Sequence, residues 1–584
     1  MKKVAAAWKR LNRKIDGLWD EKDESAVSED VASEGVRSED AVPEGVRSED
    51  AVPEGVRSED AASETDQKKA VHAEKWVCAV KKFVVSHPAD LSFVLLMGVF
   101  LFYLAWILPF NEAPDEKMRY LVPTYIYRHG TLPAGWDEEV LNKMWGISYA
   151  FHPILPYIIG GYLMRLVGIF NSSEHALLMA ARMVNVFLGM GFYWYVLKIS
   201  RRLFRKDIFR IYFVALLACL PQLLYLFVYV NTDGIAMFST AILIDGWLTG
   251  MEQKWNRGSC TRLAVGVSVC AMSYFNAYGF ALFSVVIFAG SLIVFFWKKG
   301  GKVCTCVILK RGLYITGVVF LLCGWWFIRC AVLYDGDFLG LHAPAKYGEM
   351  YAQEEFKPSV KKSVQEQGIS IEKMLRPEER GGMEWIRTTY RSTIGYFGYL
   401  RYPLGQDIYG IPKRLVLLGA IGCLLHVFLT VFKLAWNFAM YQKEQKKLPV
   451  SFALPGINLH PVNFFLLQIS LGCCIIIPIL LSLVYSYTDD FQPQGRYIMP
   501  LIIPLAWFVA AGTERVMTLF FKKWVGYLLM LPLLYAVLHV FLAAFVSVYI
   551  PTFVQSAGWL ADIRFPWFSN QSWIVTFLHL FIPG

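Results

Sequence analysis

From residue 90 onward the sequence is a succession of long apolar runs separated by shorter polar segments. Each run has roughly 18–25 residues, the length that an α-helix needs to cross about 30 Å of hydrocarbon. Because a backbone inside a bilayer must satisfy its hydrogen bonds internally, this pattern predicts an all-α polytopic membrane protein of about eleven transmembrane helices. The runs are residues 90–109, 176–198, 208–230, 233–250, 262–278, 280–297, 311–331, 412–436, 462–485, 497–515 and 524–549.

Composition supports this interpretation and excludes other classes. Hydrophobic residues make up 56% of the 584 residues, and charged residues make up 18%. Soluble domains typically have about 45–50% apolar and about 25% charged residues. A soluble enzyme, a coiled coil and a disordered scaffold are therefore excluded as descriptions of the whole chain.

The first 88 residues differ from the rest. Between Ser33 and Asp60 the sequence repeats with a ten-residue period, carries both charge signs and contains no aromatic residue. Such a segment has too little apolar surface to offset its ordering entropy, so we expect residues 1–88 to be a disordered cytoplasmic tail with decapeptide repeats. Within it, Val4–Trp19 is either an amphipathic helix on an anionic membrane surface or a solvated helical stub. Residues 89–550 form the transmembrane domain, and residues 551–584 form an external C-terminal segment.

Basic residues orient the predicted helices. With the N-terminus in the cytoplasm, every second connection lies on the cytoplasmic side and carries a basic cluster, as the positive-inside rule requires. Residues 152–170 are apolar too, but counting them as a span would invert every later loop. We therefore expect them to form an amphipathic helix along the external face. The clusters are Arg201, Arg202, Arg205 and Lys206; Lys254, Arg257 and Arg262; Lys298, Lys299, Lys302, Lys310 and Arg311; Lys443, Lys446 and Lys447; and Arg515, Lys522 and Lys523.

The net charge of +10 is explained by this topology. The tail contains 15 basic and 19 acidic residues, which leaves 42 basic and 28 acidic residues in the remainder. Much of this excess lies in the short cytoplasmic loops, where it orients helices and contacts anionic lipid. We therefore expect membrane lipid, and no nucleic acid, as the partner of the basic residues.

Most polar residues suited to chemistry lie in the predicted external loops 110–175, 332–411 and 486–496. Asp115 and Glu116 form a carboxylate pair that can accept a proton from a hydroxyl, although the same residues commonly begin a surface helix. His152 is a possible hydrogen-bonding group or a helix start. Arg496 is either a phosphate ligand or a snorkelling arginine in a turn. Asp233 is expected mainly as a helix cap, and the intramembrane Asp245 as a functional residue or an arginine partner.

Four motifs stand out in the first half of the chain: Pro114-Asp115-Glu116, His129 to Pro133, Tyr149 to Pro153, and Arg201 to Phe204. Together they resemble the GT-C superfamily of integral-membrane glycosyltransferases, which use polyprenyl-phosphate sugars. Protein O-mannosyltransferases and the aminoarabinose transferase of lipid A belong to it. The later motifs are similar to an uncharacterised bacterial polytopic membrane family; they are Gly324 to Arg329 with Tyr334 to Asp337, Ile394 to Gly398, and Gln494 to Tyr497.

The resemblance implies a GT-C-like glycosyltransferase domain over residues 89–550, in the cell (plasma or inner) membrane of a bacterial envelope. It would transfer a sugar, with inversion, from a lipid-linked donor to a hydroxyl of a glycan, lipid or protein acceptor at the external face. Asp115 would be the general base, and Glu116 would support it or help to position the acceptor. Neither a cofactor nor a metal is implied. The candidate substrate or phosphate ligands are Arg329, Arg496, His152, Arg387 and Arg391.

Two alternative functions involve other chemistry. A transporter or flippase would use intramembrane polar residues, and Asn276–Gly279 would then be a break in a helix. A sugar-polymer ligase or polymerase would share the lipid-linked substrates and the external arginines. The sequence has no evident symmetry between its halves, which disfavours the transporter.

Overall fold

The computed structural model describes residues 86–441 and 459–556, and the chain divides into two compact units, 1–96 and 97–584. Nearly all of the predicted tail 1–88, including Val4–Trp19, lies outside the described residues. So do the basic cluster at Lys443 and the predicted C-terminal segment beyond residue 556. In the first unit, the described residues contain the start of helix α4.

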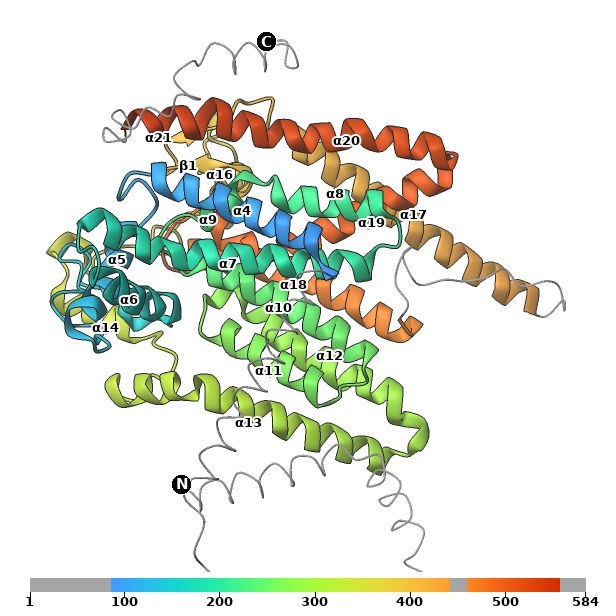
Figure 1. Cartoon of the computed structure of the whole chain (residues 1–584), viewed down its shortest axis with the longest axis horizontal. Helices are drawn as coiled ribbons and strands as arrows, with labels where there is room; N and C mark the ends of the chain where they lie inside the picture. Colours follow the sequence, from blue (N-terminus) through green and yellow to red (C-terminus); the bar gives the residue numbers. More distant parts are fainter. Residues whose placement is uncertain (1–85, 442–458, 557–584) are drawn as a thin grey trace, which may run out of the picture. The chain divides into compact units, whose positions relative to one another are not determined.

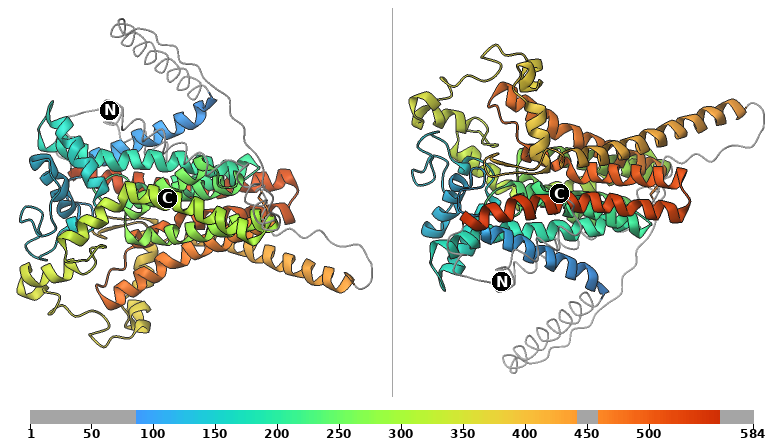
Figure 2. Two further views of the ribbon diagram at one scale, coloured as in Figure 1. Left: turned by 90° about the horizontal axis from the view of Figure 1, so that it is seen from below. Right: turned by 90° about the horizontal axis from the view of Figure 1, so that it is seen from above.

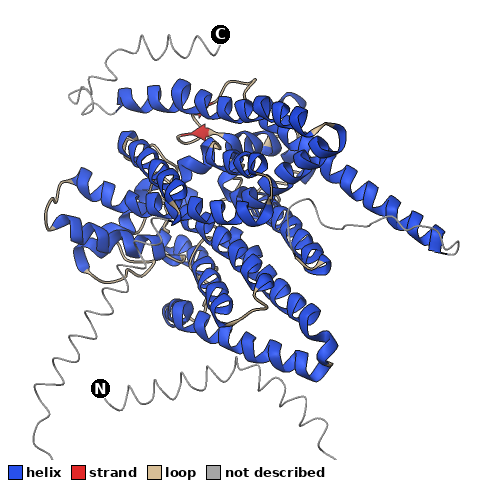
Figure 3. Ribbon diagram, turned by 45° about the vertical axis from the view of Figure 1, so that its right-hand side comes forward, coloured by secondary structure: helices blue, strands red, loops and turns tan. Residues whose placement is uncertain are grey.

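The described chain is almost entirely helical (Figures 1 and 3). Strands β1 and β2 form a short antiparallel hairpin in which Tyr396 pairs with Pro403 and Phe397 with Tyr402. The elements are α4 (Pro88–Ile107), α5 (Glu116–His129), η1 (Tyr149–Phe151), α6 (Leu155–Gly168), α7 (Glu174–Leu203), α8 (Asp207–Ala218), α9 (Pro221–Leu226), α10 (Asp233–Glu252), α11 (Arg257–Ala271), η2 (Phe275–Ala277), α12 (Tyr278–Phe296), η3 (Trp297–Lys299), α13 (Gly301–Leu333), α14 (Ala343–Tyr351), η4 (Glu354–Phe356), α15 (Ile371–Leu375), η5 (Glu378–Arg380), α16 (Trp385–Ile394), β1 (Tyr396–Phe397), β2 (Tyr402–Pro403), α17 (Gly410–Tyr441), α18 (Pro461–Thr488), η6 (Gly495–Leu501), α19 (Ile502–Phe520), α20 (Lys523–Ala544), η7 (Phe545–Tyr549) and α21 (Ile550–Ser556).

Nine helical segments in the described ranges are long and apolar enough to cross a membrane, so the protein is an all-α, multi-pass membrane protein as predicted. The other two of the eleven predicted spans have a different form. Residues 208–230 fold as α8 and α9, which are separated at Leu220 because Pro221 cannot donate the next helical hydrogen bond. Residues 262–278 fold as α11, which ends at Ala271 and has 15 residues.

Both of these shorter segments still run back along the helices beside them. Gly191 of α7 packs on Phe238 of α10, and Lys198 of α7 forms an ion pair with Asp245 of α10 at 3.3 Å, so α7 and α10 are parallel. The chain that connects the end of α7 to the start of the parallel α10 must run back along these helices, and α8 and α9 together form this return. In α11, Gly266 packs on Leu243 of α10, and residue 263 lies beside residue 246, so α11 is antiparallel to α10.

Many of the basic residues that the sequence analysis grouped lie at one common end of the helices. Lys206 forms an ion pair with Glu514 of α19 at 3.3 Å, and Arg311 of α13 donates to the carbonyl of Lys254 at 2.8 Å. The opposite end holds Asp115, Asp233 and Arg496. One end of the helices thus carries many basic residues, and the other carries two aspartates together with Arg496. Which of them faces the cytoplasm remains a prediction of the positive-inside rule.

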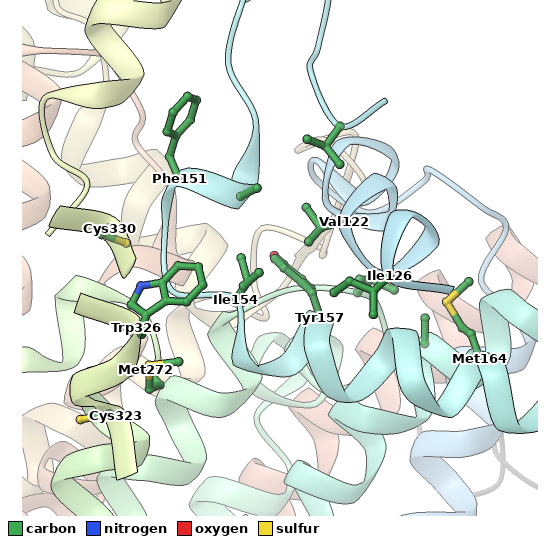
Figure 4. Close-up of a cluster of buried hydrophobic side chains, with 14 of the residues drawn as sticks. Val122, Ile126, Phe151, Ile154, Tyr157, Met164, Met272, Cys323, Trp326 and Cys330 are labelled. Atoms are coloured by element: carbon green, nitrogen blue, oxygen red, sulfur yellow. The ribbon is translucent and has the colours of Figure 1, made fainter. Parts of the chain in front are cut away.

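Helices α5 and α6 lie together with α14 near the start of α7 (Figures 1 and 2). Helix α6 has 14 residues and is not among the nine described segments long and apolar enough to cross a membrane; its position along the external face stays a prediction. Gly161 permits close packing here, because a Cβ at this position would meet Ile126 of α5. Figure 4 shows the cluster that joins this region to α13, with Phe151, Ile154 and Tyr157 near Trp326.

Candidate functional site

Asp115 lies in the turn between α4 and α5, where its backbone is left-handed (φ 61°) and its side chain makes no capping hydrogen bond. Aspartate is among the few residues that adopt this conformation readily. Its Oδ2 instead accepts a hydrogen bond from Nη2 of Arg496 at 2.7 Å. Asp115 and Glu116 thus begin helix α5, as the alternative interpretation expected, but the Asp115 side chain does not bond to the helix amides. The Asp115 side chain is 29% exposed, and that of its arginine partner 4%.

Arg496 is positioned by the turn Gln494–Tyr497 at the start of η6. Its Nη2 also donates to the hydroxyl of Tyr497 at 2.9 Å, and its guanidinium lies 4.9 Å from the centre of that ring. The preceding residue must be glycine, because a Cβ on Gly495 would collide with the backbone of α16 at Thr393. The Gly495 amide also donates to the hydroxyl of Ser392 at 2.7 Å. This close approach to α16 fixes the backbone from which Arg496 extends.

A second arginine and a second aspartate extend this contact. Arg119 follows Asp115 by one helical turn, and its Nη2 lies 3.7 Å from Oδ2 of Asp115. Its Nη1 donates to Oδ2 of Asp233 at 3.2 Å, and its guanidinium lies 4.7 Å from the ring centre of Tyr149. Asp115, Arg119, Asp233 and Arg496, which we call the Asp115 network, thus connect α5, α10 and η6.

The charges of this network keep Asp115 ionised. Burial alone would raise its pKa, but Arg496 and Arg119 outweigh burial and lower the pKa to about 2. Nearby His152 behaves in the opposite way, because burial and the charge of Arg119 lower its pKa to about 4. At neutral pH the site therefore holds a carboxylate and a neutral imidazole.

Several polar atoms around the network have no hydrogen-bond partner although they are buried. They are Nε and Nη1 of Arg496, Nε of Arg119, the hydroxyl of Tyr229 and Nδ1 of His152. Buried polar groups in folded proteins are nearly always paired, so a group of unpaired donors indicates a place for a ligand or ordered water. The free N–H groups of two arginines favour an acceptor-rich anion such as a phosphate.

Glu116 has a different environment from its neighbour Asp115. It is fully buried, and Arg182 of α7 donates to both of its carboxylate oxygens, from Nε at 2.8 Å and Nη2 at 2.7 Å. The amides of Asn111 and Val230 also donate to it, each at 3.2 Å. Its acceptor positions are therefore occupied, and the geometry gives Glu116 the place of a structural clamp. Its expected role in supporting Asp115 or positioning the acceptor stays a prediction.

Arg329 lies apart from the network. Its Nη2 donates to the carbonyls of Leu132 at 3.3 Å and Pro133 at 2.7 Å, which holds the first loop against α13. It also lines an open depression of about 570 Å³ together with Trp325 and Val332.

His152, another predicted ligand, lies close to Arg119 of the Asp115 network. The centre of its ring is 5.9 Å from that of Phe275.

The other two arginine candidates, Arg387 and Arg391, lie on α16, and each has a polar side-chain partner. Arg387 forms ion pairs with Glu379 at 2.5 Å and Glu384 at 2.7 Å. Arg391 donates to the side chain of Gln406 and stacks on Tyr409. The structure thus brings Asp115, Arg496 and His152 together, and it gives these two arginines partners elsewhere.

Two members of the network, Arg119 and Asp233, were not among the site residues predicted from the sequence. Arg119 is four residues after Asp115, a spacing that places the two side chains on the same face of a helix and was a usable signal. Asp233 was expected mainly as a cap, but Asn231 makes the cap-like bond to the amide of Gly234 at 2.9 Å. The suspected intramembrane Asp245 is paired with Lys198 and, at 3.1 Å, with Arg202. It therefore belongs to the basic end.

Asn276, the proposed break in a helix, lies in the turn η2 between α11 and α12. Its Nδ2 donates to the carbonyl of Tyr497 at 2.5 Å, so it supports the turn that carries Arg496. Tyr399, between strands β1 and β2, donates a hydrogen bond to the side chain of Asn111 at 3.0 Å. In the parts of the chain that the structure describes, no three His, Cys, Asp or Glu side chains are grouped to hold a metal ion.

Comparison with known proteins adds little to this geometry. No protein-family model matches the sequence, and no curated protein matches it. Among solved structures, the crystal structure of ArnT from Cupriavidus metallidurans in the apo state matches 73% of this chain and 78% of that chain, with 12% identity and a TM-score of 0.30.

Proposed function

We propose that the protein is a GT-C-type glycosyltransferase that transfers a sugar from a polyprenyl-phosphate donor to a hydroxyl of a glycan, lipid or protein acceptor. The observation that carries this proposal is the 2.7 Å contact between Asp115 and Arg496, beside guanidinium N–H groups that have no partner. A base and a phosphate ligand therefore lie side by side at one end of a multi-pass helical protein. We place this end at the external face of the cell membrane, with the N-terminus in the cytoplasm and the C-terminus outside.

The proposed reaction is a single displacement. Asp115 accepts the proton of the acceptor hydroxyl, whose oxygen forms a bond to the anomeric carbon of the sugar. The bond from that carbon to the phosphate oxygen breaks, and its electron pair leaves with the lipid phosphate. Because attack and departure take place on opposite faces, the configuration at the anomeric carbon is inverted. Arg496 and Arg119 stabilise the negative charge on the departing phosphate.

The ion pair with Arg496 suggests how Asp115 becomes a stronger base during this reaction. A carboxylate with a pKa of about 2 holds a proton weakly. When a donor phosphate binds Arg496, it competes with Asp115 for the guanidinium, and the pKa of the carboxylate rises toward its ordinary value. Asp233 retains its own contact with Arg119 and limits the movement of that side chain.

The test is an assay of the purified protein in lipid nanodiscs with a polyprenyl-phosphate sugar and a membrane extract as the source of acceptors. We expect release of polyprenyl phosphate to fall about 100-fold or more in Asp115→Asn, because general-base catalysis contributes at least this much. Glu138→Gln, an exposed acid of the same loop, is the matched control. Unchanged turnover in Asp115→Asn would exclude this carboxylate as the base. Intact donor crossing a sealed bilayer without cleavage would favour a flippase.

A further inference from the structure

A partly open, largely apolar cavity lies next to the turn that carries Arg496. Its volume is about 310 Å³, and α8, α16, α17, α18, α19 and α20 contribute side chains to its wall. Along the η6–α19 segment the wall runs from Ile498 past Leu501 to Val509. The step of eight positions from Leu501 to Val509 corresponds to about 12 Å of helix length. The cavity is thus long enough along the helix direction for part of a hydrocarbon chain.

Two residues on one face of α16 that line this cavity, Trp385 and Thr389, each carry a buried polar atom. Trp385 and Thr389 are one helical turn apart, and they are 5% and 3% exposed. The indole Nε1 of Trp385 and the hydroxyl of Thr389 are both buried without a hydrogen-bond partner. Their neighbours on this helix are satisfied: the Tyr390 hydroxyl donates to the Tyr409 carbonyl at 2.6 Å, and the Thr393 hydroxyl donates to the Thr389 carbonyl at 2.7 Å.

The chemistry of the wall restricts the ligand. An indole N–H is only a donor, and a hydroxyl can donate as well, so the matching group is an acceptor oxygen. Among the described residues that line the cavity none is charged, so the oxygen belongs to a neutral group. A phosphate buried there would lack a cation, which is strongly unfavourable. A carbonyl attached directly to a hydrocarbon chain meets both conditions.

We propose that this cavity binds an ester-linked acyl chain of a membrane glycerolipid, whose ester carbonyl accepts hydrogen bonds from Trp385 and Thr389. The chain lies against α19 and α20, where Ala506 and Val540 form part of the wall. The proposal is independent of the proposed glycosyl transfer, because it concerns a neutral lipid group at a different position from the Asp115 network. A glycerolipid at this place would support the η6 turn from the membrane side.

The test is photolabelling of the full-length protein in nanodiscs with phosphatidylglycerol that carries a diazirine on its acyl chain. A diether analogue with the same chains and head group lacks the carbonyl. We expect the ester lipid to label peptides of α19 and α20, and the diether to label them several-fold less. Thr389→Val and Trp385→Phe should each reduce labelling by the ester lipid about fivefold, the value expected for loss of a neutral hydrogen bond. Ala506→Phe should abolish it by filling the cavity.

Thr393→Val is the matched control, because it makes the same chemical change in the same wall but removes a hydroxyl that is already paired. Its labelling should equal that of the unaltered protein. Equal labelling by ester and diether lipids would overturn the proposal, and so would full labelling of Thr389→Val. Absence of label from α19 and α20 would indicate that water pairs the two polar atoms and would overturn it as well. None of these outcomes depends on sugar transfer.

Discussion

Two adjacent carboxylates, Asp115 and Glu116, have opposite surroundings. Asp115 is partly exposed and contacts arginines that retain unpaired N–H groups, whereas Glu116 is enclosed by Arg182 and two backbone amides. The sequence predicted both as site residues because the Arg182 side chain and the Val230 amide, which bind Glu116, are not visible in a local motif. It identified Asp115 and Arg496 separately, but their contact spans 381 residues and requires the fold.

This difference predicts different effects of two substitutions at the residue scale. Glu116→Ala should lower the free energy of unfolding by about 3–5 kcal/mol, because it leaves Arg182 charged and buried without its partner. Asp115→Asn should have a smaller effect on stability, because its side chain is 29% exposed and the amide oxygen can still accept a hydrogen bond from Arg496. Thermal unfolding of both variants in the same detergent checks this. Equal losses of stability would show that Asp115 is a structural residue as well.

The depressed pKa of Asp115 predicts a pH dependence of stability. The groups that face it are Arg496, Arg119 and Tyr149. Since its folded-state pKa of about 2 is below its ordinary value of about 3.9, the stabilisation is complete above pH 4 and disappears as pH falls through 2. The difference in melting temperature between the unaltered protein and Asp115→Asn should therefore be constant from pH 5 to 8 and shrink below pH 4. A difference that instead shrinks near pH 6 would contradict this assignment.

At the scale of elements, the long helices were predictable and the breaks between them were not. Hydropathy identified residues 208–230 as one span, yet Pro221 divides it into α8 and α9. Hydropathy measures the preference of a segment for lipid and is insensitive to single interruptions of the helical hydrogen bonds. The η6 turn is another such interruption, and it carries Arg496.

The close packing of η6 on α16 predicts that an added side-chain atom at Gly495 lowers activity. Gly495→Ala should displace the turn, because the added Cβ collides with the backbone of α16 at Thr393. A displacement of about 1 Å at Arg496 should lower glycosyl transfer on the order of 100-fold. Gly472→Ala in α18 is the control, since a Cβ there has no neighbour within 4 Å and should leave turnover unchanged. Full activity of Gly495→Ala would show that the position of this turn is not critical.

For the molecule as a whole, charge connects sequence, fold and function. Many of the basic residues in the described ranges lie at one end of the helices, where Lys206 meets Glu514 and Arg202 meets Asp245. The Asp115 network lies at the other end and contains equal numbers of acids and arginines. The distribution of charge was predictable because it follows from the alternation of loops. The network required contacts between α5, α10 and η6, which no periodicity encodes.

The orientation of these two ends is the last prediction. The positive-inside rule places the basic end in the cytoplasm and Asp115 outside. A cysteine introduced at Arg205 should therefore react with a membrane-impermeant maleimide only after the cells are opened, and one at Asp335 should react in intact cells. Both residues lie in connections between helices, and their labelling is compared with that of the unaltered protein, because free cysteines are already present. Labelling of residue 205 in intact cells would reverse the orientation and place the proposed transfer in the cytoplasm.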